Sequence, residues 1–326
     1  ELEHDDEDEF ALQGQLVNGL ARTMRRKLGE IEPLRRRSSG GSADRSDRVL
    51  AGVMRSHELL HRGTSKHLIQ AMGGFRRALE LEPGMPLAHA GMAEALVYKF
   101  LMFDGDVSFL TKAQEEAHQA LALDANCPEA HTSLGFAYSM AGRSSDARRE
   151  YRLAIQLDHS EWLAHRLLGA HYARQGNYTE AISLLQRSID LKPSHLAAYD
   201  HAYSALDRAG QYERALVVAE KGVQAGLARL SEVPDDQDVR LHLALLLARR
   251  GSTDDARDQV RRAREAHPKD GYSLFHLACV HALFGEAQEA LDLLRDAQDR
   301  GYYIQSELHS NSDLDLLRGN REFQEL

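Results

Sequence analysis

The sequence has 326 residues, a formal net charge of −10, 43% hydrophobic residues and only two cysteines. This apolar content suffices for a continuous core, and the acidic balance argues against general nucleic-acid binding. Cys127 and Cys279 are far apart in the sequence, which gives no sign of a disulfide framework or a cysteine-based metal site and favours a reducing, cytoplasmic setting. No apolar run approaches the roughly 18 residues of a membrane span, so we expect no membrane partner.

Residues 1–34 combine an acidic lead-in with one amphipathic helix. Glu1–Glu9 are almost all acidic, and apolar residues recur at helical spacing from Phe10 to Leu28. Acidic residues before a helix complement its dipole, although an acidic ligand site is the alternative interpretation. The chain begins with Glu1 rather than Met, so we expect it to be part of a longer protein.

Residues 35–42 form a Gly/Ser linker that separates this helix from the main array. Arg35–Arg37 form its basic start and are interpreted as a solvated flank; an anion-docking site, or phosphorylation of Ser38, is the alternative. We expect a helical array over residues 43–304 and a C-terminal cap over residues 305–326.

Three consecutive segments, starting at Pro128, Trp162 and Leu196, repeat the same residue types every 34 positions. In each segment, apolar residues mark one face of a helix, a glycine ends that helix, and small residues mark one face of a second helix. A fixed period of this length predicts stacked helix pairs, none of which can bury its apolar face alone. The matching positions are Gly142, Gly176 and Gly210, and Ala147, Ala181 and Ala215.

The same rhythm extends to both sides of these segments and predicts seven pairs. The first two pairs are expected at Ala43–His61 with Ser65–Leu81, and at Met85–Phe103 with Leu110–Leu123. After Gly222 the spacing slips by seven residues, which indicates an insertion before the last two pairs.

This pattern resembles the tetratricopeptide repeat (TPR) family. The residues that carry the resemblance in the second segment are Leu168, Gly169, Tyr172, Gly176, Tyr178, Ala181, Leu185 and Pro193. The resemblance implies an all-α, right-handed superhelix of about seven helix pairs, with the N-terminal amphipathic helix before it and a C-terminal capping helix after it. It also implies a protein–protein interaction module without a cofactor.

Both flanks resemble segments of bacterial multidomain signalling proteins that carry a TolB-like domain before a TPR region. These segments are EFALQGQLVNGLARTM at the N-terminus and SDLDLLRGNREFQEL at the C-terminus. The resemblance implies a regulatory region for an upstream adenylate cyclase, Ser/Thr kinase or CadC-like winged-helix regulator. Its function would be to bind a protein partner or itself. A purely structural homo-oligomerisation scaffold is the alternative.

In this family the partner binds on the concave wall formed by the first helix of each pair. Lys and Asn residues that clamp a C-terminal carboxylate in some members are replaced here by other types, such as Phe136 and Arg166, so we do not expect that ligand. The wall positions predicted to contact a protein or peptide are Phe136, Met140, Arg166, Arg174, Asp200, Asp207, Arg208, Arg249, Tyr272, Phe275 and His276.

His57, Glu58 and His61 match the H-E-x-x-H motif of zinc peptidases, so a zinc hydrolase is a further alternative. Such an enzyme needs a third ligand and a cleft, usually beside a sheet edge, and no strand pattern precedes the motif. The segment also aligns with the first helix of a pair, where apolar packing explains its leucines. We therefore predict no metal, no catalytic centre, and neutral roles for the other helix-borne histidines.

Overall fold

The computed structural model describes residues 42–265, 270–304, 308 and 311–326. The chain divides into two compact units, Glu1–Ala51 and Gly52–Leu326. Of the first unit, the described part is the N-terminal portion of helix α2. The expected N-terminal amphipathic helix, residues 35–41 of the expected linker and Ser38 lie outside the described residues. Ser42, which the sequence placed in the linker, is the first residue of α2. The second unit carries the rest of α2 and all the later predicted repeats.

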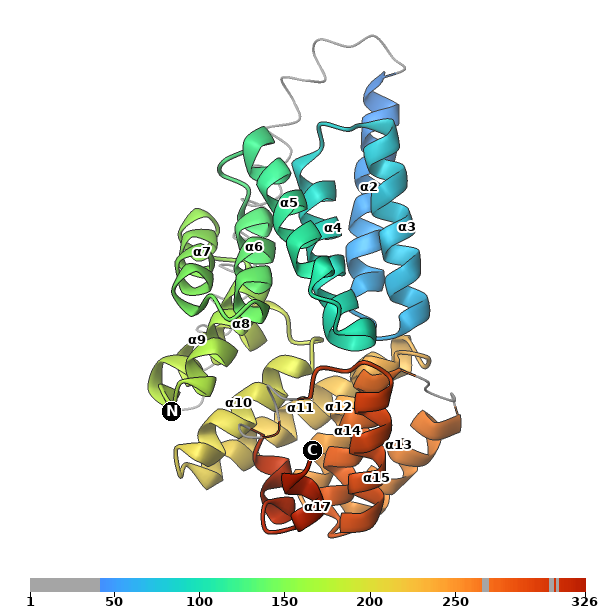
Figure 1. The fold of residues 1–326 in the computed structure, drawn as a ribbon, viewed down its shortest axis with the longest axis vertical. Coiled ribbons are helices and arrows are strands. Elements are labelled where there is room, and N and C mark those ends of the chain that lie inside the picture. Colours follow the sequence, from blue (N-terminus) through green and yellow to red (C-terminus); the bar gives the residue numbers. More distant parts are fainter. Residues whose placement is uncertain (1–41, 266–269, 305–307, 309–310) are drawn as a thin grey trace, which may run out of the picture. The chain divides into compact units, whose positions relative to one another are not determined.

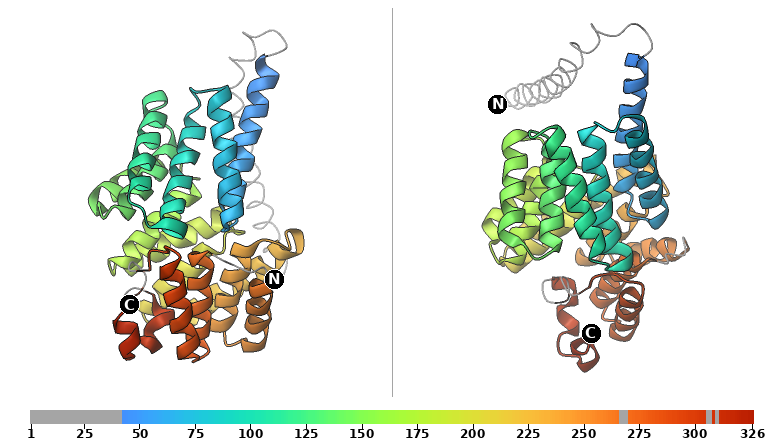
Figure 2. Two further views of the ribbon diagram at one scale, coloured as in Figure 1. Left: turned by 45° about the vertical axis from the view of Figure 1, so that its right-hand side comes forward. Right: turned by 45° about the horizontal axis from the view of Figure 1, so that its top comes forward.

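All seven predicted helix pairs are present, and the described residues contain no β-strand. Neighbouring helices run side by side in antiparallel pairs (Figures 1 and 2). The pairs are α2 (Ser42–Leu60) with α3 (Ser65–Leu81), α4 (Pro86–Lys99) with α5 (Ser108–Leu123), α6 (Pro128–Met140) with α7 (Ser144–Leu157), α8 (Trp162–Arg174) with α9 (Tyr178–Leu191), α10 (Ala197–Arg208) with α11 (Tyr212–Glu232), α12 (Gln237–Arg249) with α13 (Thr253–Glu265), and α14 (Gly271–Leu283) with α15 (Ala287–Asp299).

A glycine in the left-handed backbone conformation ends the first helix of each of the last five pairs, as the repeat pattern predicted. Gly176 has a φ of 79° and its amide donates to the carbonyl of Ala173 at 3.0 Å. The next amide, of Asn177, donates to the carbonyl of Tyr172 at 3.0 Å. This bond is one of those that satisfy the carbonyls at the end of the helix. A Cβ on Gly176 would meet no atom within 4 Å, so only backbone strain excludes other residues there.

Small residues in the first helices let the two helices of a pair approach closely. A Cβ on Gly169 would lie 2.7 Å from Cγ of Leu185 on the partner helix, and a Cβ on Gly135 would lie 2.8 Å from the ring of Tyr151. Ala181 is fully buried. The repeated glycines and alanines are thus determined by interhelical distance.

Two pairs depart from the regular form. In the second pair, a π-helical turn at Phe100–Asp104 (η1) follows α4 and occupies the long connection seen in the sequence. In the fifth pair, the predicted insertion extends helix α11 to 21 residues. Seven added residues are about two helical turns, so the buried face of α11 stays in phase.

Pairs that are far apart in the sequence also contact one another within Gly52–Leu326. The amide of Tyr303 donates to the carbonyl of Leu101 at 3.4 Å, and the Tyr303 ring packs 5.7 Å from that of Phe100. On the other side, Arg229 of α11 lies 3.8 Å from the carboxylate of Glu58 on α2. The array therefore closes on itself rather than contacting only sequence neighbours.

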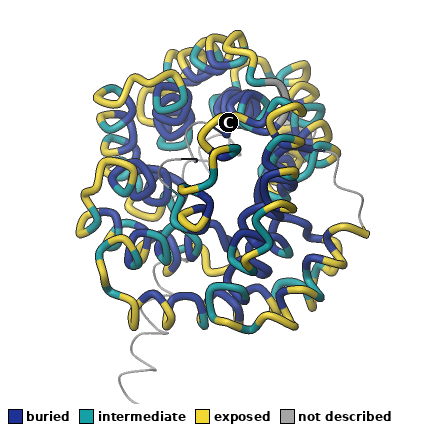
Figure 3. The backbone as a smooth tube through the Cα atoms, turned by 60° about the horizontal axis from the view of Figure 1, so that its bottom comes forward, coloured by how far each residue is buried: buried dark blue, intermediate teal, exposed yellow. Residues whose placement is uncertain are grey.

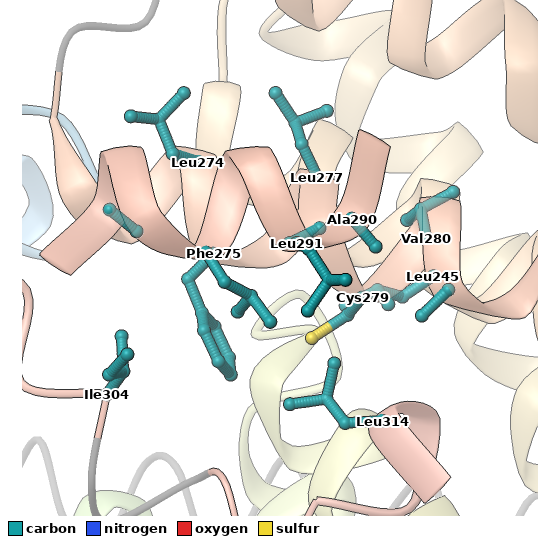
Figure 4. Close-up of a cluster of buried hydrophobic side chains, with 14 of the residues drawn as sticks. Leu245, Leu274, Phe275, Leu277, Cys279, Val280, Ala290, Leu291, Ile304 and Leu314 are labelled. Atoms are coloured by element: carbon teal, nitrogen blue, oxygen red, sulfur yellow. The ribbon is translucent and has the colours of Figure 1, made fainter. Parts of the chain in front are cut away.

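The C-terminal cap is a 3₁₀ segment, η2 (Ser312–Leu317), followed by a one-turn helix, α17 (Arg321–Gln324). The single capping helix that we expected is divided because Asn320 caps a new helix, accepting from the amide of Glu322 at 2.8 Å. Leu314 and Phe323 are buried in one cluster with residues of α14 and α15, such as Leu291 (Figure 4). The segment thus covers the last apolar surface of the array.

Candidate functional site: an inner cavity and two histidine–carboxylate clusters

The first helices of the pairs form a wall that is buried on nearly every side. In α8, all residues from Leu163 to Tyr172 are buried, whereas the second helix α9 has only four buried residues. Figure 3 shows buried segments on the inner side of the tube and exposed segments along its outer rim. One side of each first helix packs on other helices, and the opposite side faces a cavity of about 480 Å³. This volume lies within the range of pockets that hold drug-sized ligands.

Most of the predicted wall positions do line this cavity. They are Phe136, Met140, Arg166, Arg174, Asp200, Arg208, Tyr272, Phe275 and His276. Two predicted positions, Asp207 and Arg249, are not among the lining residues. The period of the repeat therefore places the correct face of each first helix inward, but it does not determine what each side chain contacts.

Two of the predicted wall arginines pair with the C-terminal cap. Arg249 is 1% exposed and makes a double contact with Asp313, at 2.8 Å from Nε and 2.6 Å from Nη2. Its third nitrogen, Nη1, lies 2.5 Å from Asp200. Arg208 lies 2.8 Å from Asp315. The cap therefore occupies cationic groups that the sequence assigned to a partner.

Arg166 and Arg174 have no ion pair among the described residues, and both line the cavity. Arg166 is 7% exposed; its Nη2 donates to the hydroxyl of Tyr98 at 3.3 Å, and its Nε has no hydrogen-bond partner in the described part of the chain. Arg174 donates to Ser139 at 3.1 Å. Burial lowers the pKa of His195 well below its usual value, and the Arg166 charge lowers it further.

His57 and His61 lie one helical turn apart at the C-terminal end of α2 and face Glu94 of α4. His57 Nδ1 is 3.8 Å from one carboxylate oxygen of Glu94, and His61 Nε2 is 3.7 Å from the other. Glu94 is 3% exposed, and burial raises its pKa to about 8. Burial, together with the nearby charge of His57, lowers the pKa of His61 well below 6.5. We call these three residues the α2–α4 cluster.

Glu58, the acid of the H-E-x-x-H motif, does not join this cluster in an ion pair. Its side chain is 58% exposed, and it pairs with Arg62 at 3.3 Å and Arg229 at 3.8 Å. The carboxylate between the two histidines comes instead from Glu94, which sequence reasoning missed. A signal existed: Glu94 is the one charged residue in the otherwise apolar or small run from Ala90 to Val97.

A second cluster joins Asp200 of α10, His242 of α12 and His276 of α14; we call it the α10–α14 cluster. His242 Nδ1 is 3.5 Å from Asp200, and its Nε2 is 3.1 Å from the hydroxyl of Tyr272. Burial raises the pKa of Asp200, but the charges of Arg249 and His242 outweigh it and hold that pKa well below the usual value. The carboxylate of this cluster, Asp200, thus has cationic neighbours that compensate its charge.

Histidines at the junctions between pairs have a structural role. Nε2 of His131 lies 3.1 Å from the carbonyl of Ala125, six residues earlier, and its Nδ1 lies 2.7 Å from Glu150. His89 repeats both contacts, with Pro83 at 3.0 Å and Glu116 at 2.6 Å. Both ring nitrogens are occupied, so these histidines fix the turn between pairs.

Comparison with known proteins agrees with the repeat. A tetratricopeptide repeat profile matches residues 137–195, 199–270 and 241–302, together half of the chain. "Putative adenylate cyclase 3" of Rhizobium meliloti (strain 1021) is 30% identical over 145 residues, which cover 43% of this chain and 24% of that protein. The chain therefore spans about a quarter of the length of this relative.

Similar solved structures include a thermophilic TPR protein of Thermus thermophilus, with 18% identity, a TM-score of 0.46, and coverage of 61% of this chain and 98% of that one. A TPR protein of Parabacteroides merdae ATCC 43184 has 15% identity and a TM-score of 0.44, covering 82% and 98%. The type IV pilus biogenesis factor PilW has 21% identity and a TM-score of 0.42, covering 67% and 92%.

None of the described helices is both long and apolar enough to cross a membrane. The period of 34 residues, the paired helices with a glycine at each turn, and the family profile lead to one conclusion. The chain belongs to the tetratricopeptide repeat family.

Proposed function

We propose that this chain is a protein-interaction module that receives an acidic segment of a partner protein in its inner cavity. The observation that carries the proposal is Arg166, a buried guanidinium that lines the cavity and has no ion pair among the described residues. A buried charge is costly unless it is paired, so an anionic group entering the cavity would gain more there than in water.

Aromatic side chains beside Arg166 supply the apolar part of such a site. Tyr98 and Phe136 pack edge to face with ring centroids 5.4 Å apart, and both line the cavity. Arginine and aromatic residues are the types that dominate binding energy at protein interfaces. The size of the cavity suits a few side chains of a partner, whereas a whole helix is 10–12 Å across.

The biological setting is also a proposal. The similarity to a protein named putative adenylate cyclase 3, of which this chain matches 24%, supports a role as the regulatory region of a bacterial signalling protein. The two cysteines are buried and form no disulfide in the described part of the chain, which suits a cytoplasmic location. Self-association through the same wall remains the alternative use of the surface, and light scattering distinguishes it from binding of a foreign segment.

The test is selection of peptides from a random display library on the immobilised chain, followed by calorimetry with the enriched peptides. We expect enrichment of sequences that place Asp or Glu beside an aromatic residue. Arg166→Met should weaken their binding at least about tenfold, because it keeps much of the side-chain volume but removes the cation.

Arg187→Met is the matched control. Arg187 lies on the second helix α9 and is exposed, so its removal should leave the affinity unchanged. Enriched peptides without acidic residues, or equal binding to the wild-type chain and to Arg166→Met, would refute the proposal.

A further inference from the structure

We propose that His57, His61 and Glu94 form a binding site for a divalent metal ion of the zinc type, unrelated to the peptidase chemistry of the H-E-x-x-H motif. The site does not depend on the proposed partner binding. It rests on the distances, the orientation and the bonding of these three side chains.

The distances suit three ligands around one ion. His57 Nδ1 and His61 Nε2 lie 3.8 and 3.7 Å from the two oxygens of Glu94, and one ligand atom from each residue lies within 4.8 Å of the others. Direct hydrogen bonds would need about 3.2 Å or less. Ligands at about 2.0–2.1 Å from a tetrahedral zinc ion are about 3.4 Å apart. The two histidine–carboxylate distances therefore need only a small contraction, and the three ligand atoms together must move closer from separations of at most 4.8 Å.

The orientation of the ligands is fixed by packing. The ring of His57 lies against α4, where a Cβ on Gly91 would come within 2.9 Å of its Nε2. The ring of Phe75 packs edge to face on His57 at 4.9 Å. Nδ1 of His57 is the nitrogen that faces Glu94. Ligands that are held before the ion arrives lose little conformational freedom on binding.

One carboxylate oxygen of this cluster also lacks a hydrogen-bond partner. Oε1 of Glu94 is buried and has none in the described part of the chain, and it is the oxygen that faces Nε2 of His61. An ionised carboxylate without such a partner is expensive to bury. A divalent cation between the two imidazoles and Glu94 would take the place of the carboxyl proton and balance the carboxylate. Two histidines and one carboxylate hold zinc in this way in known sites with an open fourth position.

The α10–α14 cluster provides an internal control because it has the same donor types but a carboxylate that is already paired. Asp200 lies 2.5 Å from Arg249, and His276 Nδ1 lies 2.9 Å from the carbonyl of Tyr272. A cation there would have to compete with a buried guanidinium. We therefore assign the metal to the α2–α4 cluster alone.

The fourth position of the ion would be reached from the cavity, because His61 lines it. Hydrolysis is not implied: Glu58, which would act as the base in a peptidase, is exposed and paired with Arg62 and Arg229. The ion would instead join α2 to α4 and stabilise the start of the array.

The chain contains its own reporter for the test. Trp162 is the single tryptophan, and its ring centroid lies 5.1 Å from that of His61. We expect one equivalent of Co²⁺ to quench Trp162 fluorescence in the full chain and to give visible absorption of a four- or five-coordinate site. Zn²⁺, which does not quench, should displace Co²⁺, restore the emission and raise the Tm.

Glu94→Gln and His61→Gln should weaken Co²⁺ binding at least about tenfold. Glu94→Gln has the shape of the neutral acid, so it should retain the wild-type circular dichroism and cooperative unfolding. Two control variants, Glu58→Gln and His276→Asn, should bind Co²⁺ as the wild-type chain does.

The proposal would be overturned if equilibrium dialysis left less than one bound Zn²⁺ per chain. It would also be overturned if folded Glu94→Gln bound Co²⁺ as tightly as the wild-type chain. Loss of binding in Glu58→Gln or in His276→Asn would equally overturn it, because the ion would then lie elsewhere.

Discussion

The two histidine–carboxylate clusters use the same kinds of side chain and differ in their neighbours. In the α10–α14 cluster, Arg249 balances Asp200, and the hydroxyl of Tyr272 meets His242. In the α2–α4 cluster, Glu94 has no arginine within ion-pair distance among the described residues, and burial raises its pKa to about 8. The comparison teaches that two clusters of the same side-chain types can differ in electrostatics, because the partner of each charged group differs.

The largest expected effect comes from removing the cation that completes the α10–α14 cluster. Arg249→Met leaves Asp200 and Asp313 buried without their partner, which should cost roughly 3–5 kcal/mol of unfolding free energy. Urea denaturation followed by circular dichroism measures it. The matched control is Arg261→Met, because Arg261 is 59% exposed and its surface ion pairs contribute about 0–1 kcal/mol. Equal effects of the two variants would show that the Arg249 network is not a stabilising one.

The second prediction concerns acid stability and depends on His276. Burial, together with the charge of His242, lowers the pKa of His276 from 6.5 to about 4. The unfolded chain therefore takes up this proton first as the pH falls, so stability is retained above pH 6.5 and is lost toward pH 4, by about 3 kcal/mol. His242 opposes this trend, since its pKa is raised by Asp238 and Asp200 against the effect of burial.

His276→Asn isolates the contribution of His276, because an amide can still donate to the carbonyl of Tyr272 but does not titrate. Urea titrations at several pH values between 4 and 7 should give a shallower loss of stability for this variant than for the wild-type chain. Parallel pH profiles of the two proteins would contradict the assignment.

The smallest expected change in stability comes from a substitution in the α2–α4 cluster of the metal-free chain. Glu94→Gln replaces a carboxyl that is mostly protonated at neutral pH by an amide of the same shape, so in the presence of a chelator it should change stability by less than about 1.5 kcal/mol. Asp200→Asn, the equivalent change in the other cluster, should cost more because it leaves Arg249 without one of its two partners. Urea denaturation measures both losses. A larger loss of stability for Glu94→Gln than for Asp200→Asn would contradict the proposed difference between the two clusters.

The helix pairs could be predicted well from the sequence because the residues that determine each pair lie within that pair. Gly176, Gly169 and Ala181 recur with the period of one pair, and each is required by a turn or by a close approach within that pair. The inward-facing positions followed from the same period. The all-α TPR architecture could therefore be inferred before the structure.

Contacts between distant pairs could not be predicted in this way. Glu94 lies in a different pair from His61, and Asp313 reaches Arg249 across 64 residues. No periodicity encodes such contacts, because they depend on how far the array curves and on where the cap returns. The zinc-peptidase motif contains two of the proposed ligands but not the third, Glu94, since residue spacing on one helix does not reveal which side chains the neighbouring helix contributes.

The contact between Leu101 and Tyr303 has a consequence for the history and the engineering of this chain. An open solenoid can gain or lose a unit at little cost, because each unit touches only its neighbours. Here the second pair contacts the segment that follows the last pair. Deleting or duplicating one unit would move these two contact surfaces apart. Such a chain has a fixed number of units, and it should unfold in one cooperative step rather than fray from its ends.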